Sequence, residues 1–285
     1  MAASTPASGL ALFLLAHHDD EVFCAGRLSR ALTSGRGVRL MWATAGGLAP
    51  ARRRVAEGVR VVEALGLPAG AATDLLLRDQ HAVEHVEVIA REVVRQVDHA
   101  GAGARATGGG AHGGETDEDG SEGAPPHAGA GGAAAGGATV YVPAYEGGNP
   151  DHDAVNLAAA LALRARPGLR VLEFPLYRRG AHGLDVQSPV ASAKTPPEPF
   201  DVLTLTDQDL ALRRALARAN RSQLAVSLAP LLTLARWAGR GRAEPARPLP
   251  AHDYARPPHP GRLLYELYTP WRFAAWAVAA GRSRG

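Results

Sequence analysis

Short, continuous apolar runs alternate along the chain with longer stretches that have helical spacing. The apolar runs have the length and continuity of strands buried on both faces, and they lie at residues 10–16, 38–44, 139–143 and 169–174. The helical stretches lie between and around them, at residues 21–32, 52–65, 82–97 and 154–164. This alternation predicts an α/β fold, Rossmann-like, with a mostly parallel sheet and helices on both faces.

Residues 101–138 interrupt this alternation. They are mostly Gly and Ala, with an acidic run and no apolar period. Such a segment buries too little apolar surface to offset its ordering entropy, so we expect a disordered insert. The insert joins a helix to the next strand, and such connections in a parallel sheet lie opposite the edge where ligands bind. We therefore expect it to take no part in the chemistry.

The last third of the chain has a different pattern. Residues 208–235 have the Arg/Leu/Ala spacing of one long amphipathic helix, and residues 240–262 are rich in Arg and Pro, which indicates a segment wrapped around the surface. Aromatic residues then gather between residues 263 and 280, a cluster more typical of packing than of binding. We expect one domain over residues 1–240, insert included, and a C-terminal extension over residues 241–285 that packs on the core.

The composition narrows the function classes. The net charge is only +3, and the arginines are scattered with few aromatic residues between them, which argues against a nucleic-acid groove. The single cysteine excludes an internal disulfide framework. No apolar run is long enough to cross a bilayer, and the N-terminus lacks the basic start and cleavage site of a signal peptide. We expect a cytoplasmic protein without a membrane span.

Ionisable residues follow directly on the first predicted strand, in the run His17-His18-Asp19-Asp20-Glu21. Burying several such groups at a strand end costs free energy unless something compensates them. Imidazole and carboxylate are natural ligands of Zn²⁺, and the turn would let His17 and Asp20 converge, with Asp19 beside them. The simpler interpretation is that the acids cap the next helix, which explains the carboxylates but not the two histidines.

A second His/Asp cluster follows the strand at residues 139–143. It runs from Tyr145 to Asp153, and His152 stands at the start of the next helix, where it could supply a third ligand. Both clusters fall at the carboxyl ends of strands, the edge where open α/β sheets bind ligands. Their coincidence predicts a metal site. A dinucleotide-binding protein is a distant alternative, because a G-x-G-x-x-G turn is missing after the first strand.

These clusters resemble two motifs of a known family. Residues 16–21 (AHHDDE) resemble the AHPDDE signature of the PIG-L/LmbE-like zinc-dependent N-deacetylases, and residues 149–152 (NPDH) resemble their HPDH motif. Residues 54–57, followed by Leu65-Gly66, resemble the family's R-x-x-E helix, and Arg78-Asp79 lies where the family has a substrate-facing aspartate. The resemblance extends over about residues 10–225.

The resemblance implies an activity and a role for each matched residue. It implies a zinc-dependent hydrolase that removes an N-acyl group, N-acetyl above all, from an amino-sugar substrate, either a small molecule or a glycoconjugate. It implies that Asp19 is the general base and that Arg54 and Asp79 contact the sugar. The ligands that it implies for the Zn²⁺ cofactor are His17, Asp20 and His152. Asp151 would orient a ligand or a neighbouring group.

Two positions depart from the family pattern. His18 replaces a proline, and it could act as a fourth ligand or a substrate contact. Asn149 replaces the first histidine of the HPDH motif. An amide can still donate a hydrogen bond to an oxyanion but has no titratable proton. Either another group supplies the proton, with Asp19 in a dual role as the simplest candidate, or turnover is slow. This leaves two alternatives: a catalytically weakened protein that binds zinc and sugar, and an amidase that acts on a larger conjugate.

Overall fold

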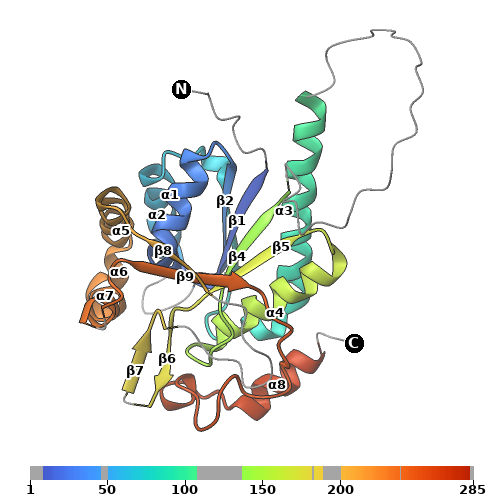
Figure 1. Cartoon of the computed structure of the whole chain (residues 1–285). Helices are drawn as coiled ribbons and strands as arrows, with labels where there is room; N and C mark the ends of the chain where they lie inside the picture. Colours follow the sequence, from blue (N-terminus) through green and yellow to red (C-terminus); the bar gives the residue numbers. More distant parts are fainter. Residues whose placement is uncertain are drawn as a thin grey trace, which may run out of the picture.

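The computed structural model describes residues 9–45, 51–107, 137–181, 183–188, 200–237 and 239–282. A seven-stranded sheet forms its centre, with the strand order β3-β2-β1-β4-β5-β9-β8 (Figure 1). Five neighbouring strands are parallel, β3 (Ala72–Leu77), β2 (Gly37–Thr44), β1 (Leu10–Leu15), β4 (Thr139–Pro143) and β5 (Arg170–Phe174). The predicted Rossmann-like, mostly parallel α/β fold is therefore confirmed.

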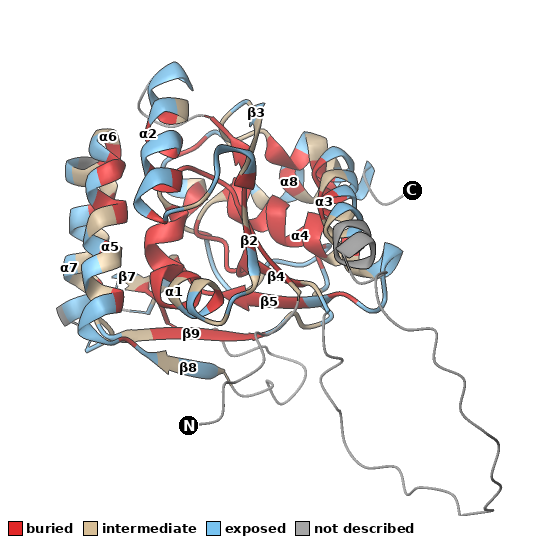
Figure 2. Cartoon of the chain, turned by 90° about the horizontal axis from the view of Figure 1, so that it is seen from above, coloured by how far each residue is buried: buried red, intermediate tan, exposed pale blue. Residues whose placement is uncertain are grey.

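Strand β1 lies inside the sheet, between β2 and β4, and contributes to both hydrophobic cores. Its residues alternate between the two faces, so that Leu10, Leu12 and Leu14 pack in one core and Ala11, Phe13 and Leu15 in the other. The first core is covered by α3 (Val86–Thr107), α4 (Pro150–Ala165) and α8 (Phe273–Arg282), and the second by α1 (Ala25–Thr33), α2 (Ala51–Ala64) and α5 (Asp207–Ala219) (Figure 2). Burial on both faces explains why this run is continuously apolar.

Two predicted helices begin differently from the expectation. Residues 20–24 and 82–85 form 3₁₀ turns, η1 (Asp20–Cys24) and η3 (Ala82–His85), that lead into α1 and α3. Helix α3 continues to Thr107, so the disorder expected from residue 101 is wrong for residues 101–107, and residues 108–136 of the insert lie outside the described residues. Strand β3 was not expected, because an edge strand that is only partly buried lacks a continuous apolar run.

The long helix expected over residues 208–235 is divided into several pieces. Helix α5 ends at Ala219, and α6 (Arg221–Gln223), a π-helical turn (Leu224–Leu228) and α7 (Ala229–Trp237) follow. At the break the Asn220 side chain donates to Glu21 at 2.6 Å, and the Ser222 N–H donates to Glu57 at 2.8 Å. These contacts with distant parts of the chain compete with a continuous helix.

The prediction that residues 240–262 wrap around the surface is wrong for the first part of this segment. Residues 243–248 form β9 (Ala243–Pro248), which lies antiparallel between β5 and β8 (Asp201–Thr204), so the sheet extends past the boundary expected at residue 240. Its polar residues are buried with partners, because Glu244 binds Arg213 at 2.8 Å and Arg247 binds Glu173 at 2.7 Å. Since those partners are far away in the sequence, the local pattern suggested a solvated segment.

Glu173, on β5, is the centre of a buried polar network beside β9. Besides Arg247, it accepts hydrogen bonds from Asn156 at 3.0 Å and from His252 at 2.8 Å. Burial alone would raise the pKa of Glu173, but the bond and charge of His252 and the Arg247 guanidinium together lower it below its usual value. The network therefore favours the ionised carboxylate and fastens β9 to the parallel part of the sheet.

The C-terminal segment packs on the loop that precedes α4. The Trp276 side chain is fully buried, and its Nε1–H donates to the Pro150 carbonyl at 3.1 Å. The Leu264 N–H donates to the Gly147 carbonyl at 3.0 Å. Helix α8 lies beside α4 as a result (Figure 1). Within the described part of the chain, no helix combines the length and the apolar character needed to cross a membrane.

Candidate metal centre and its cavity

A cavity of about 410 Å³ opens at the carboxyl ends of β1 and β4. Six of its lining residues were predicted as site residues, and they come from four separate parts of the sequence: His17, Asp19, Asp20, Arg54, Asp79 and Asn149. Two further predicted residues, Asp151 and His152, are buried and contact these residues from α4. The parallel topology brings both motifs to one edge of the sheet, as their positions after two strands predicted.

The turn after β1 is held by its own carboxylates. Asp20 accepts hydrogen bonds from the backbone N–H groups of Ala16 and His17, both at 2.9 Å. Asp19 has a φ of 124°, a conformation that costs a non-glycine residue free energy, and its N–H donates to Glu21 at 3.0 Å. No cap bond from the Asp19 side chain is present at the start of η1. Simple helix capping therefore does not explain this cluster.

Three potential metal ligands converge beside that turn. Nitrogen and carboxylate oxygen atoms of His17, Asp20 and His152 all lie within 4.8 Å of one another. The His152 Nε2 atom is 3.2 Å from an Asp20 oxygen but outside hydrogen-bond geometry, and neither ring nitrogen of this buried side chain has a hydrogen-bond partner among the described residues. A buried imidazole without partners beside a carboxylate is suited to sharing a cation with it. The donor set therefore fits Zn²⁺.

Two carboxylates hold the other nitrogen of His17. Its Nε2 atom lies 3.1 Å from Asp79 and 3.2 Å from Asp151, which is itself fixed by the N–H groups of Gln80 at 2.6 Å and Ala82 at 2.9 Å. Burial alone would lower the pKa of His17, but these hydrogen bonds and the nearby carboxylate charges raise it well above its ordinary value. His17, Asp79 and Asp151 could also surround an ion. A ligating histidine commonly gives its second nitrogen to a carboxylate, which favours the triad with His152.

Asp19 reaches the cavity beside the three candidate ligands. Burial raises its pKa to about 8, although the Arg54 guanidinium, 3.2 Å away, favours the charged form. Arg54 is itself only 1% exposed and also contacts Glu57 at 3.3 Å. Since a side chain that transfers protons works best with a pKa near the ambient pH, Asp19 is suited to this task.

The two departures from the family pattern occupy different surroundings. Asn149 lines the cavity, and its Oδ1 atom accepts from the Asp151 N–H at 2.8 Å, which caps α4. His18 does not line the cavity. Its fully buried ring stacks on Trp42, with ring centroids 4.5 Å apart, and its Nε2 atom lies 2.8 Å from Asp74. The idea that His18 is a fourth ligand or a substrate contact is therefore wrong.

Sequence reasoning missed much of the cavity wall. Tyr177 was not among the predicted site residues, and Tyr268 belongs to the aromatic cluster that was interpreted as packing. Tyr268 is 52% exposed, and its hydroxyl donates to the Gly148 carbonyl at 2.7 Å. Neither position carries a local signal, because both enter the site only through the fold. The other residues missed in the lining are Phe23, Gln80, Gln223, Ser227 and Leu231.

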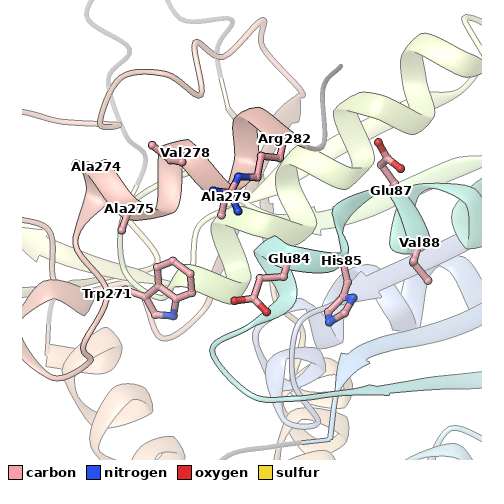
Figure 3. A pocket seen from close by; sticks show the side chains of 10 residues that line it. All are labelled: Glu84, His85, Glu87, Val88, Trp271, Ala274, Ala275, Val278, Ala279 and Arg282. Carbon is pink, nitrogen blue, oxygen red and sulfur yellow. The ribbon is translucent and has the colours of Figure 1, made fainter.

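A larger hollow of about 800 Å³ lies elsewhere, between the start of α3 and α8 (Figure 3). Its walls carry Glu84 and His85 on one side and Trp271 and Val278 on the other (Figure 3). None of the predicted site residues lines it. Size therefore does not identify the functional site in this protein, and the chemistry of the lining does.

The fold and the site define an α/β protein with a His/Asp centre at the carboxyl edge of its sheet. The family model described as PIG-L, GlcNAc-PI de-N-acetylase, matches residues 12–163, which is more than half of the chain. The chain belongs to the PIG-L family. A search of curated proteins gave no match.

Solved structures share this fold at low sequence identity. A deacetylase–bog complex from the teicoplanin biosynthesis pathway is 16% identical, with a TM-score of 0.52, over 84% of this chain and 97% of that one. A deacetylase–teicoplanin complex is 14% identical with a TM-score of 0.53 over 84% and 97%. The zinc-inhibited form of teicoplanin deacetylase Orf2 is 15% identical with a TM-score of 0.51 over 84% and 98%. The similarity extends beyond the part that the family model matches.

Proposed function

We propose that this protein is a zinc-dependent hydrolase that removes an N-acyl group, most simply N-acetyl, from an amino-sugar substrate. The observation that carries the proposal is the convergence of His17, Asp20 and His152 at one side of a polar cavity. Membership of a family described by a de-N-acetylase activity gives the class of reaction. Zinc, when bound, would polarise the acyl carbonyl and make a water molecule more acidic.

Asp19 is the residue that we assign to proton transfer. It takes a proton from water as the water oxygen adds to the acyl carbon. The C–N bond then breaks, its electron pair stays on nitrogen, and the proton from Asp19 passes to that nitrogen. A second water proton ends on the amine, so the products are a carboxylate and an ammonium. Arg54 keeps the Asp19 carboxylate facing the cavity, at 3.2 Å, and the position of Asp19 in the lining allows both transfers.

The remaining polar residues bind and orient the substrate. Asp79 and Gln80 line the cavity beside His17 and offer a carboxylate and an amide to sugar hydroxyls. Asn149 presents its amide on the side of α4, where a hydrogen bond to the developing oxyanion would lower the barrier. A cavity of about 410 Å³ has room for a single sugar ring with its acyl group, and further groups of a glycoconjugate would lie outside it.

The first test is the metal content of the purified protein, measured by elemental mass spectrometry. We expect about one zinc ion per chain in the wild type and a large loss in His152→Ala. His99→Ala is the matched control, because that histidine is exposed on α3, where its ring contacts the Arg95 carbonyl. If zinc is absent after reconstitution, or if both variants lose it equally, the proposed centre is wrong.

A second candidate function follows from Asn149, which cannot supply a titratable proton. On this hypothesis the protein binds zinc and an amino sugar without turning it over. Saturable binding of N-acetylglucosamine with no release of acetate, across a panel of acylated amino sugars, would favour it. Mass spectrometry of the products separates simple deacetylation from amide cleavage in a larger conjugate, because the two release different acids.

A further inference from the structure

The position that is histidine in the family motif shares the cavity wall with two tyrosines in this chain. Asn149, Tyr177 and Tyr268 all line the cavity, with the Asn149 side chain close to the Tyr177 hydroxyl and that hydroxyl close to Tyr268. The Tyr268 hydroxyl donates to the Gly148 carbonyl at 2.7 Å. The Asn149 carbonyl oxygen is already used by the Asp151 N–H. The end of the amide that can face Tyr177 is therefore its NH2 group, which is a donor, and this leaves the Tyr177 proton for another acceptor.

Tyr177 lies next to the candidate metal centre. It lines the cavity with His17, Asp19 and Asp20, and its ring packs edge-on against His152, with ring centroids 5.3 Å apart. The backbone of Tyr177 is held too, because its N–H donates to the buried Glu146 carboxylate at 2.9 Å. A phenol O–H keeps its proton at neutral pH and is a strong hydrogen-bond donor.

We infer that Tyr177 is a further catalytic residue, whose hydroxyl donates a hydrogen bond to the tetrahedral oxyanion in place of the histidine that Asn149 has replaced. The inference rests on the proposed function. The neighbouring Tyr268 is half-exposed, so water can solvate it when the Tyr177 O–H turns to the oxyanion. The oxyanion therefore gains a hydrogen-bond donor beside the candidate metal centre without leaving a buried polar group unsolvated.

The test is a double-mutant cycle between Tyr177→Phe and Asn149→His, with N-acetylglucosamine as the substrate and fluorescamine to detect the released amine. Tyr177→Phe keeps the ring against His152 and removes only the hydroxyl. We expect kcat to fall about 100-fold with KM little changed, as for loss of one oxyanion donor. Asn149→His should restore much of this loss in the Tyr177→Phe background, so that the effects of the two substitutions are not additive.

Two further measurements separate catalysis from structure. Methylphosphonate, a tetrahedral anion, should bind the zinc-loaded Tyr177→Phe protein about tenfold more weakly in calorimetry, because one hydrogen bond to a charged group is lost. Zinc content and the thermal midpoint should stay at wild-type values. Tyr145→Phe is the matched control, since that hydroxyl donates to the Arg256 carbonyl at 2.7 Å and Tyr145 does not line the cavity.

The outcomes are distinct. An active wild type whose kcat survives Tyr177→Phe, or an Asn149→His effect that is equal in both backgrounds, overturns the role of Tyr177 and leaves the deacetylase proposal intact. A zinc-loaded wild type that neither releases amine nor binds methylphosphonate overturns the proposed function, and the role of Tyr177 with it.

Discussion

Gly58→Ala gives a sharp test of how His18 is accommodated. A Cβ atom at Gly58, inside α2, would lie 2.8 Å from the His18 Cδ2 atom and 3.4 Å from Trp42. The imidazole has little room to yield, because it stacks on Trp42 and its Nε2 atom lies 2.8 Å from Asp74. The first distance is shorter than side-chain packing tolerates, so the substitution must displace a ring that is held on two sides.

Two opposing magnitudes decide the result. Alanine gains about 1 kcal/mol over glycine in a helix interior, whereas forcing an extra methyl group into a packed core costs about 1–3 kcal/mol. Since His18 is held on two sides, we expect the clash to dominate and the free energy of unfolding to fall by about 1 kcal/mol. In a His18→Ala background the obstacle is gone, and Gly58→Ala should stabilise the protein by about 0.5–1 kcal/mol.

Urea unfolding followed by far-UV circular dichroism measures all four proteins of this cycle. The expected coupling energy is about 2 kcal/mol, well above the error for independent sites. Gly281→Ala, in α8 with no atom within 4 Å of the added Cβ, is the control that reports helix propensity alone. If Gly58→Ala stabilises the wild type as much as it stabilises His18→Ala, His18 does not lie against α2 and the argument fails.

Three other predictions follow from the structure. Glu173→Gln should destabilise the fold by about 3 kcal/mol at pH 7 in urea unfolding. Because the folded-state pKa of Glu173 is lowered, its contribution to stability is present above pH ~4.5 and is lost as the pH falls further. A stability difference between the two proteins that stayed constant in acid would contradict this. Replacing residues 108–136 by a short Gly/Ser linker should leave zinc content and turnover nearly unchanged, since β4 begins at the edge opposite the site; a large loss of either would refute this placement. Gly148→Ala should abolish soluble expression or activity, because its Cβ would collide with the Tyr177 carbonyl oxygen, and a fully active variant would show that the two loops are not in contact.

The central strands were predictable because their burial requires a continuous apolar run in the sequence. A strand covered on both faces is apolar at every position, and four such strands were recognised, together with the helices between them. Strand β9 has no such apolar run. Its buried charges, Glu244 and Arg247, have partners on α5 and β5, and only the folded chain shows that they are compensated.

The site was predictable to the same extent. The candidate ligands stand at the ends of recognisable strands, so topology alone brings His17 and His152 together. Tyr177 and Tyr268 reach the cavity from segments whose paths depend on contacts with distant loops. His18 shows the converse. It lies inside the motif, and only the packing of Trp42 against α2 reveals that it faces away from the cavity.

The position of β9 in the sheet also determines the order in which the protein can be completed during synthesis. Strand β5 ends at Phe174, and its partner β9 begins only at Ala243. At about 5–20 residues per second, the ribosome needs several seconds to make the intervening chain. Throughout that interval one edge of β5 has open backbone donors and acceptors that can pair with another nascent chain. Chains released before Ala243 would carry this open edge permanently, and we expect them to aggregate or to be retained by chaperones.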